Sequence, residues 1–315
     1  MSKFLGIDTS CYTTSLAVYD SEKGLICEER IILKVKMGGR GLSQSNMVYQ
    51  HVRNLPVLMQ RISPSLGDVS VIGVSSFPRR RADSFMPAFL VGKGLADSLS
   101  AAVHIPMYQF SHQENHALSA IREAPELWGK DFYLMHLSGG TQDVLRCAWK
   151  QNKIEIQELI TTRDITAGQL IDRIGVALGL LFPAGKHLEI LAMEGKDKNY
   201  VLPMTKILNA FSFSGQENQC LHDIEGNQYN KADIAKGLLC HIGDSLEKEL
   251  LNYPFEKGTP FVSIGGVMSN LYLKGLVNDI CREKMLKPYF ASPKYSSDNA
   301  SGNAFGAFMN YSSRY

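Results

Sequence analysis

The sequence predicts an α/β fold with two lobes, each built around a central sheet. Short β-type runs alternate with helical segments along all 315 residues, and this order of elements is typical of α/β domains. The same pattern of strand, polar turn and strand occurs twice, at 4–19 and at 132–149. Because single cores stop growing near roughly 250–300 residues, we expect two lobes related by an internal duplication.

The first lobe is expected to open with a hairpin. The runs FLGI and SLAVY, at 4–7 and 15–19, flank the polar turn DTSCYTT, as two paired strands would. The segment 47–62 has helical periodicity but contains Pro56, which predicts a break or a kink. The elements expected after it are a strand at 69–77, a loop of sequence PRRRADS, a helix at 85–103, a strand at 105–110 and a helix at 112–123.

The second lobe is expected to repeat this order. Strand, glycine turn and strand recur at 132–149, and the polar stretch 212–230 predicts a loop. The other expected elements are helices at 168–181, 186–195, 231–252, 269–286 and 299–312 and strands at 260–266 and 288–291. We therefore predict an N-terminal lobe, 1–107, and a C-terminal lobe, 108–298, with a C-terminal helix, 299–315, packed back on the first lobe.

Composition and charge favour no particular class of partner. Apolar residues make up 44% of the chain, and the formal net charge is only +2, so a nucleic-acid contact would need a local patch. Arg79–Arg81 is the best local candidate, and a solvated loop is the alternative. Scattered cysteines without a CxxC pair, no signal peptide and no apolar run of ~20 residues predict a cytoplasmic protein without a membrane span.

HQENH, at 112–116, is the strongest candidate for a metal site. On a helix, His112 and His116 share one face, so both imidazoles could reach one cation at ~2.0–2.2 Å. The alternative is a polar helix face without a metal. A zinc-protease motif needs glutamate directly after the first histidine, where this chain has Gln113. Glu114 points away from the histidine face, so a metalloprotease is disfavoured.

A two-histidine site needs a third ligand, typically a carboxylate. Among the late acidic residues, Asp298 in YSSDNASGNAFGAF is the candidate. Because Asp298 precedes a predicted helix, capping of that helix is its alternative role.

Three glycine-containing or polar turns follow strands and indicate a nucleotide site. LSGGTQ, which contains Leu137, Ser138, Gly139, Gly140 and Thr141, would let backbone N–H groups approach an anion. Thr9 and Ser10 in DTSCYTT could do the same from the first lobe, and SIGGVMSN offers a helix N-terminus to a nucleotide. Each turn has an ordinary structural alternative, and no GxxxxGK[ST] loop is present.

The segment 166–192 adds two acidic residues to this candidate site. Asp172 lies on an otherwise apolar helix, where an uncompensated carboxylate is costly. Gly185 marks a tight turn, and Glu189 follows it on the next helix. Asp172 and Glu189 could bind the hydroxyls of a ribose or polyol, and a surface position is the alternative for Glu189.

The ordered motifs resemble the TsaD-type family of tRNA threonylcarbamoyladenosine synthases, formerly called glycoproteases, which have the actin-like ATPase and sugar-kinase fold. The similarity covers almost the whole chain. The motifs that carry it are GIDTSCYTTSLAVYD, HQENH, LSGGTQ, AGQLID with GLLFPAGKHLE, FSFSG at 211–215, GGVMSN and SSDNASGNA.

This resemblance implies a function and a set of site residues. His112, His116 and Asp298 would hold an iron or zinc ion. The residues implied to line the phosphate or carbamoyl end are Leu137, Ser138, Gly139, Gly140 and Thr141, and those implied to hold the nucleoside are Asp172, Gly185, Glu189 and Asn270. The expected reaction transfers threonylcarbamoyl from threonylcarbamoyl-adenylate to the adenine next to the anticodon in tRNA, with partner proteins of that pathway.

The chain also departs from the family pattern. Tyr12 and Thr13 stand where the family has Asp-Glu, and Thr141 replaces a histidine or asparagine. PRRRADS replaces a GPG loop, and Ala184 and Lys186 replace Gly and Pro. Three alternatives therefore stay open: a divergent paralogue with a non-tRNA acceptor, a non-catalytic partner subunit, and a sugar kinase that uses Asp8 as its base.

Overall fold

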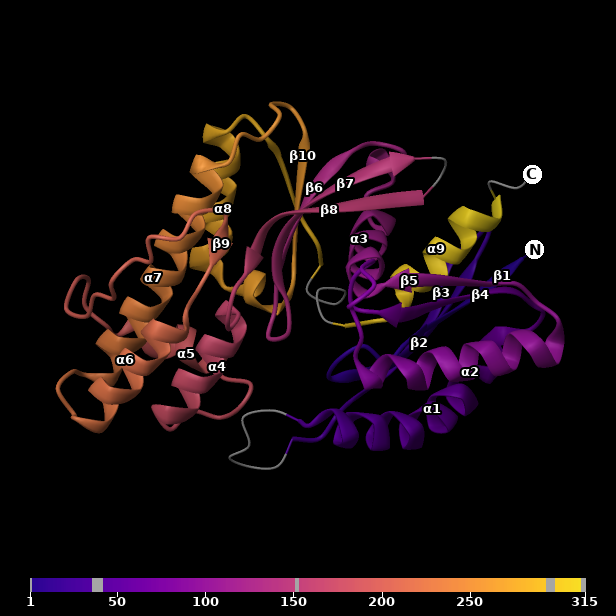
Figure 1. Cartoon of the computed structure of the whole chain (residues 1–315), viewed down its shortest axis with the longest axis horizontal. Helices are drawn as coiled ribbons and strands as arrows, with labels where there is room; N and C mark the ends of the chain where they lie inside the picture. Colours follow the sequence, from indigo (N-terminus) through magenta and orange to yellow (C-terminus); the bar gives the residue numbers. More distant parts are fainter. Residues whose placement is uncertain (1, 36–41, 151–152, 293–297, 313–315) are drawn as a thin grey trace. The chain divides into compact units, whose positions relative to one another are not determined.

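The computed structural model describes residues 2–35, 42–150, 153–292 and 298–312, and the chain forms two compact units (Figure 1). Unit 1 takes in residues 1–130, 148–156 and 294–315, and unit 2 takes in 131–147 and 157–293. The lobe boundaries 1–107 and 108–298 remain predictions. Of the predicted C-terminal helix, 299–315, residues 313–315 lie outside the described part of the chain.

Unit 1 contains a five-stranded sheet in the order β3-β2-β1-β4-β5. Its strands are β1 (Lys3–Asp8), β2 (Thr13–Asp20), β3 (Gly24–Ile32), β4 (Val69–Phe77) and β5 (Met107–Ser111). β1, β2 and β3 pair antiparallel, whereas β4 is parallel to β1 and β5 is parallel to β4. The apolar residues of β1, β2 and β4 are buried and form the core of this unit.

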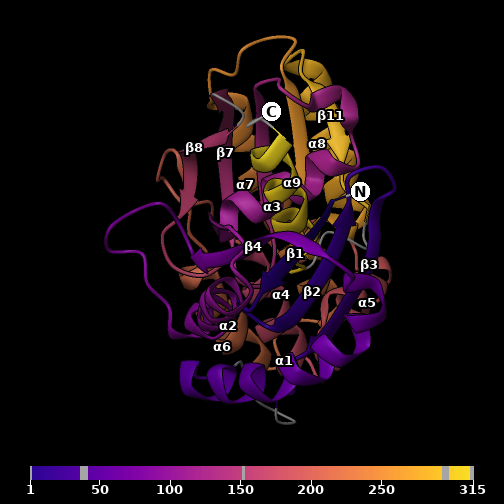
Figure 2. The same ribbon diagram turned by 90° about the vertical axis from the view of Figure 1, so that its right-hand side faces the viewer.

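Helices cover both faces of this sheet. They are α1 (Gln44–Leu66), α2 (Pro87–Val103), α3 (His112–Arg122) and α9 (Ser301–Ser312), with a short 3₁₀ turn, η1 (Pro125–Leu127). α1 and α2 lie along one face, and α9 with α3 lies along the other (Figure 1, Figure 2). The chain at the start of α9 lies very close to the sheet, because Gly6 and Gly73 have no Cβ. A Cβ at Gly6 would lie 2.2 Å from the Ala300 carbonyl oxygen, and a Cβ at Gly73 would lie 2.1 Å from the Asn303 carbonyl oxygen.

Unit 2 repeats the strand order of unit 1. Its sheet runs β11-β10-β6-β7-β8-β9. The strands are β6 (Phe132–Leu137), β7 (Gln142–Lys150), β8 (Lys153–Thr162), β9 (Ala210–Phe211), β10 (Pro260–Ile264) and β11 (Lys287–Phe290). β6 pairs antiparallel with β7 and parallel with β10, which is parallel to β11. The predicted duplication is therefore confirmed, with β9 added at one edge.

The helices of unit 2 pack into a large apolar core with this sheet. They are α4 (Ala167–Ala177), α5 (Gly185–Met193), α6 (Ser214–Glu225), α7 (Lys231–Asn252) and α8 (Leu271–Glu283), with a 3₁₀ turn, η2 (Gly266–Ser269). α4 contacts α5, α6 and η2, and α7 contacts α5 and α8. None of the helices in the described part of the chain is long and apolar enough to cross a membrane.

The structure differs from two sequence-based expectations about helices. Of the break or kink expected at Pro56, the break is absent, because α1 runs from Gln44 to Leu66 through that residue. Pro56 and Val52, whose carbonyl loses its helical partner, are both exposed, so water can satisfy that carbonyl. The loop expected at 212–230 contains α6 instead. Its buried face is largely polar, with Gln216, Glu217 and Asp223 inside, so apolar periodicity does not reveal it.

Candidate functional site

The HQENH segment forms the first turns of α3. Ser111 is the N-cap: its hydroxyl accepts the Glu114 N–H at 3.1 Å, and the Glu114 carboxylate accepts the Ser111 N–H at 2.6 Å. This capping box fixes where the helix begins. His112 and His116, four residues apart, consequently lie on one face of the helix.

The two histidines and Asp298 converge within unit 1. The His112 Nε2 and His116 Nε2 atoms lie 3.1 Å apart. Asp298 Oδ1 lies 3.7 Å from the first and 3.4 Å from the second. Ligand atoms around a tetrahedral zinc at ~2.0–2.1 Å are about 3.3–3.5 Å apart. Three such donors aimed at one point fit a divalent transition-metal ion.

The start of α9 brings Asp298 to this place. Asn299 Oδ1, and not Asp298, accepts the Ser301 N–H at 3.0 Å. Asn115 on α3 donates to the Asn299 carbonyl at 2.7 Å. A Cβ at Gly302 would lie 2.0 Å from the Asn115 carbonyl oxygen, so this close approach requires glycine. The contact between α3 and α9 therefore holds the carboxylate beside the histidines.

Burial sets the protonation of His112. Desolvation, reinforced by the charge of His116, lowers the pKa of His112 to about 3, although Asp298 opposes it. A neutral imidazole is the form that binds a metal. Asp8 is also buried, and desolvation with the nearby Asp298 charge raises its pKa to about 7. The sequence suggested Asp8 only as the base of a sugar kinase. Its closeness to Asp298 results from the tertiary fold, so the sequence could not reveal it.

The predicted phosphate residues of the first hairpin are buried. Thr9 Oγ1 donates to the Ala88 carbonyl at 2.9 Å and accepts the Gly92 N–H at 3.0 Å. Ser10 Oγ donates to Asp8 Oδ2 at 2.8 Å. Thr9 thus ties the β1–β2 turn to α2, whereas Ser10 is bonded to the neighbouring Asp8. Phosphate binding by Thr9 and Ser10 stays a prediction.

The β6–β7 turn of unit 2 is open by comparison. Gly139 and Gly140 are exposed. Ser138 Oγ accepts the N–H groups of Gly140 and Thr141 at 3.2 and 3.0 Å. Leu137, which precedes the turn, is buried and ends β6.

Two glycines from other elements pack against this turn. A Cβ at Gly168, on α4, would lie 2.5 Å from the Ser138 carbonyl oxygen, and one at Gly265 would lie 2.0 Å from that of Leu137. Gly265 also has φ 112°, which disfavours other residues. The sequence showed the double glycine at Gly265, but the closeness of Gly168 could be found only from the fold.

Asp172 lies next to this turn and contacts the residue that precedes Gly185. Asp172 Oδ1 accepts the Ala184 N–H at 2.8 Å, just before α5 begins at Gly185. Asp172 Oδ2 lies 3.9 Å from the position of a Cβ on Gly139. Partial burial raises the pKa of Asp172, against the effect of the Ala184 hydrogen bond. The α4 carboxylate therefore links the glycine turn to the N-terminus of α5.

Glu189 and Asn270 meet at the start of α8. Glu189 Oε1 accepts the Leu271 N–H at 2.9 Å. Asn270 is the N-cap, and its Oδ1 accepts the Leu273 N–H at 3.0 Å. The predicted residues of unit 2 thus form two groups. One is the glycine turn with Asp172 and Gly185, and the other is the pair Glu189 and Asn270. Helix α5 carries Gly185 of the first group and Glu189 of the second.

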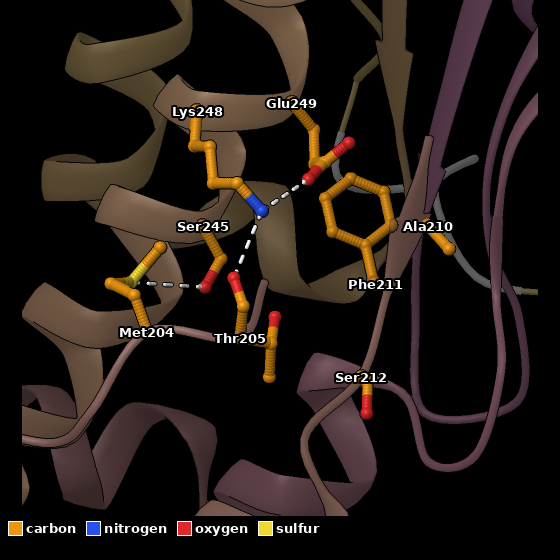
Figure 3. A pocket seen from close by; sticks show the side chains of 8 residues that line it. All are labelled: Met204, Thr205, Ala210, Phe211, Ser212, Ser245, Lys248 and Glu249. Atoms are coloured by element: carbon orange, nitrogen blue, oxygen red, sulfur yellow. Dashed lines mark hydrogen bonds and ion pairs between the residues drawn. The ribbon is translucent and has the colours of Figure 1, made fainter. Parts of the chain in front are cut away.

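A small pocket elsewhere in unit 2 contains none of the predicted residues (Figure 3). Its lining residues are Met204, Thr205, Ala210, Phe211, Ser212, Ser245, Lys248 and Glu249. Lys248 Nζ donates to the Thr205 and Ile207 carbonyls at 3.0 and 2.6 Å and lies 3.0 Å from Glu249 Oε1. The Lys248 ammonium therefore holds the segment of Thr205 and Ile207 against α7, and we assign it a structural role.

Comparison with protein families and curated proteins gives a consistent match. The family model described as "TsaD: tRNA N6-adenosine threonylcarbamoyltransferase" matches residues 50–305. A protein of that name from Buchnera aphidicola subsp. Schizaphis graminum is 28% identical, over 98% of this chain and 93% of its own. Another from Thermosipho melanesiensis is 29% identical, over 96% of this chain and 93% of its own.

Solved structures resemble the chain at low sequence identity. HypF from T. kodakarensis has a TM-score of 0.65 at 12% identity, covering 99% of this chain and 48% of that one. Component A of (R)-2-hydroxyglutaryl-CoA dehydratase from Acidaminococcus fermentans has a TM-score of 0.59 at 13% identity, covering 99% and 100%. A ROK family protein from Streptococcus pneumoniae has a TM-score of 0.55 at 14% identity, covering 98% and 97%. These likenesses concern the fold alone, and they confirm the actin-like ATPase and sugar-kinase class.

Proposed function

This chain belongs to the TsaD family, whose model is described as tRNA N6-adenosine threonylcarbamoyltransferase, and from that premise we propose a specific reaction. The protein transfers the threonylcarbamoyl group of threonylcarbamoyl-adenylate to the amine of the adenine next to the anticodon in tRNA. A carbamoyl–nitrogen bond forms, the bond to the adenylate phosphate breaks, and AMP leaves.

His112, His116 and Asp298 are the residues that would hold a divalent metal, iron or zinc. Their donor atoms lie at separations that suit one ion. When bound, the metal supplies Lewis-acid polarisation of the carbamoyl oxygen. Burial keeps His112 neutral, and the α3–α9 contact holds Asp298 in place, so this arrangement is preorganised.

The residues of unit 2 would bind the adenylate. The glycines of the β6–β7 turn are exposed, so a phosphate could approach the backbone of the turn. The Gly140 and Thr141 N–H groups would then exchange their bonds to Ser138 Oγ for bonds to the phosphate oxygens. Asp172, beside that turn, and the pair Glu189 and Asn270 would orient the nucleoside, with Gly185 allowing close approach. The hydrogen bonds from Ala184 and Leu271 restrict the two carboxylates before ligand binds, which lowers the ordering cost.

One observation carries this proposal beyond the family match: the convergence of the two histidines with a carboxylate from a distant part of the chain. Purified protein, threonine, bicarbonate, ATP, an adenylate-forming enzyme and unmodified tRNA would test it, with nucleoside mass spectrometry as the readout. We expect threonylcarbamoyladenosine with the parent protein and at least about 100-fold less with His116→Ala. Equal product from the two proteins would refute the metal-dependent reaction.

A second candidate function keeps the same reaction but changes the acceptor. Tyr12, where the family has an acidic residue, packs against the small apolar cluster of Leu33, Met47 and Ala88. Thr13 is buried at the start of β2. If the mixture above yields no modified tRNA even with partner proteins of the pathway, but the protein still releases AMP with a small amine, this alternative is favoured. Partner proteins and a cytoplasmic location remain predictions.

A further inference from the structure

Arg80 makes contacts that set it apart from a solvated loop residue. Its Nε lies 2.8 Å from Glu114 Oε1, and its Nη2 donates to the Gln109 carbonyl at 2.9 Å. Its guanidinium carbon lies 5.4 Å from the centre of the Phe77 ring. These contacts join the loop after β4 to the end of β5 and to the first turn of α3. Arg80 lies in PRRRADS, where this chain departs from its family.

The partner carboxylate is shared between Arg80 and the helix cap. Glu114 Oε1 contacts Arg80, while Glu114 Oε2 accepts the Ser111 N–H at 2.6 Å. The Glu114 side chain is only 7% exposed, although that of Arg80 is 59% exposed. A buried carboxylate needs a charged partner or several donors, and loss of its cation leaves a desolvated charge. Arg80 consequently helps to hold the Glu114 carboxylate in the position from which it accepts the Ser111 N–H.

The capping box in turn fixes the two histidines. His112 follows the N-cap residue Ser111, and His116 lies one turn later. Displacement of this turn would change the 3.1 Å separation of the two Nε2 atoms. Partners that orient metal ligands from outside typically contribute 10–100-fold to metal affinity.

We propose that Arg80 is a positioning residue, which acts through Glu114 on the first turn of α3 and so holds His112 and His116 in the geometry that binds a metal. This inference rests on the metal site in the proposed function. It assigns a role to one arginine of PRRRADS that is distinct from nucleic-acid contact.

The test compares Arg80→Ala and Arg80→Lys with Arg81→Ala in the full chain. Arg81 is a matched control, because its Nε lies 3.9 Å from Asp83, whose side chain is 82% exposed. Zinc would be titrated into metal-free protein, and amide hydrogen exchange would be measured in the first turn of α3 without zinc. Arg80→Ala should weaken zinc binding about 10-fold and speed exchange in that turn. Arg80→Lys should recover part of both, and Arg81→Ala should change neither.

A double variant checks the route through Glu114. If Arg80 acts through that carboxylate, Arg80→Ala should add nothing to the loss of zinc affinity caused by Glu114→Gln. Additive losses, or an Arg80→Ala variant that matches Arg81→Ala in both readouts, would overturn the inference. Failure of the parent protein to bind zinc would instead count against the proposed metal centre, and the exchange rates would still decide the positioning role. Thermal unfolding of each variant separates these effects from loss of the fold.

Discussion

The β1–β2 and β6–β7 turns occupy equivalent positions in two sheets with the same strand order, yet their environments differ. In unit 1 Thr9 and Ser10 are buried, and their hydroxyls donate to protein acceptors. In unit 2 the turn has two exposed glycines, and Ser138 Oγ accepts the Gly140 and Thr141 N–H groups. The polar side chains of the first turn are enclosed by protein, whereas the glycines of the second turn face solvent.

This difference indicates that the duplicated units have different tasks. Buried hydroxyls that are already paired have little capacity for a ligand. In the exposed turn a ligand can reach the backbone and take over N–H groups that now donate to Ser138 Oγ. The unit with the closed turn carries the histidine and aspartate cluster, and the unit with the open turn carries the residues proposed for the adenylate. Variants at matched positions of the two units test this division of tasks.

The largest effect is expected for Gly168→Ala. The added methyl would lie 2.5 Å from the Ser138 carbonyl oxygen and 2.6 Å from the Gly139 nitrogen, so the backbone of the turn or of α4 must move. We expect a loss of about 3 kcal/mol in unfolding free energy and weaker ATP binding, measured by urea titration and calorimetry. Gly215→Ala, where nothing lies within 4 Å, is the control. Unchanged ATP binding in Gly168→Ala would mean that this turn does not contact the nucleotide.

The corresponding change in unit 1 is Thr9→Val. It removes a buried hydroxyl that donates to the Ala88 carbonyl and accepts the Gly92 N–H. Leaving those groups unpaired should cost about 2 kcal/mol of unfolding free energy, read from urea titration. ATP affinity should stay as in the parent, because the Thr9 hydroxyl is already paired with protein groups. A clear loss of ATP affinity at unchanged stability would show that Thr9 contacts the ligand.

Ser138→Ala should have a smaller effect on stability. Ser138 is partly exposed, so water can replace its bonds to the Gly140 and Thr141 N–H groups, and the cost should be about 1 kcal/mol. The turn would become more mobile, which faster amide exchange at Gly140 and Thr141 would reveal. Exchange rates equal to those of the parent would show that other contacts hold the turn.

The smallest effect is expected from the pH dependence of Asp164, in unit 2. Partial burial raises its pKa, but hydrogen bonds from Ser212, Ser214 and the backbone outweigh it and lower the pKa to about 2. The folded-state pKa lies below the unfolded value of 3.8, so the stabilisation is present above pH 4 and is lost between pH 4 and 2. Because Asp164 is exposed, solvent screening reduces this stabilisation to about 0.5 kcal/mol. The unfolding free energies of the parent and of Asp164→Asn, from urea titrations, should differ by this amount at pH 6 and converge towards pH 2. A difference that stays constant with pH would show that the charge of Asp164 is not its cause.

The two hairpins could be predicted from the sequence, because they have local signatures, and the spacing in HQENH also predicts two histidines on one helix face. The strands β3 and β8 and the order of strands within each sheet were not predicted. The two hairpins alternate apolar runs with polar turns, and HQENH has the helical spacing of two ligands. α6 could not be predicted, since Glu217 on its inner face pairs with Arg173 at 3.0 Å and Asp223 accepts from Tyr200 at 2.8 Å. Those partners are distant in sequence. Arg80 and Glu114 are likewise distant in sequence, and so are Gly168 and the glycine turn that it approaches. Their contacts could therefore be found only from the fold.

The most direct test of the division between the units measures zinc and ATP binding on two variants, His116→Ala and Asp172→Ala, beside the parent. The account predicts that the first loses zinc but binds ATP as the parent does, and that the second loses ATP but retains zinc. His222→Ala, whose side chain is 78% exposed, should bind both. Loss of both ligands in a single folded variant, or of neither in either variant, would contradict the assignment of the metal to unit 1 and the nucleotide to unit 2.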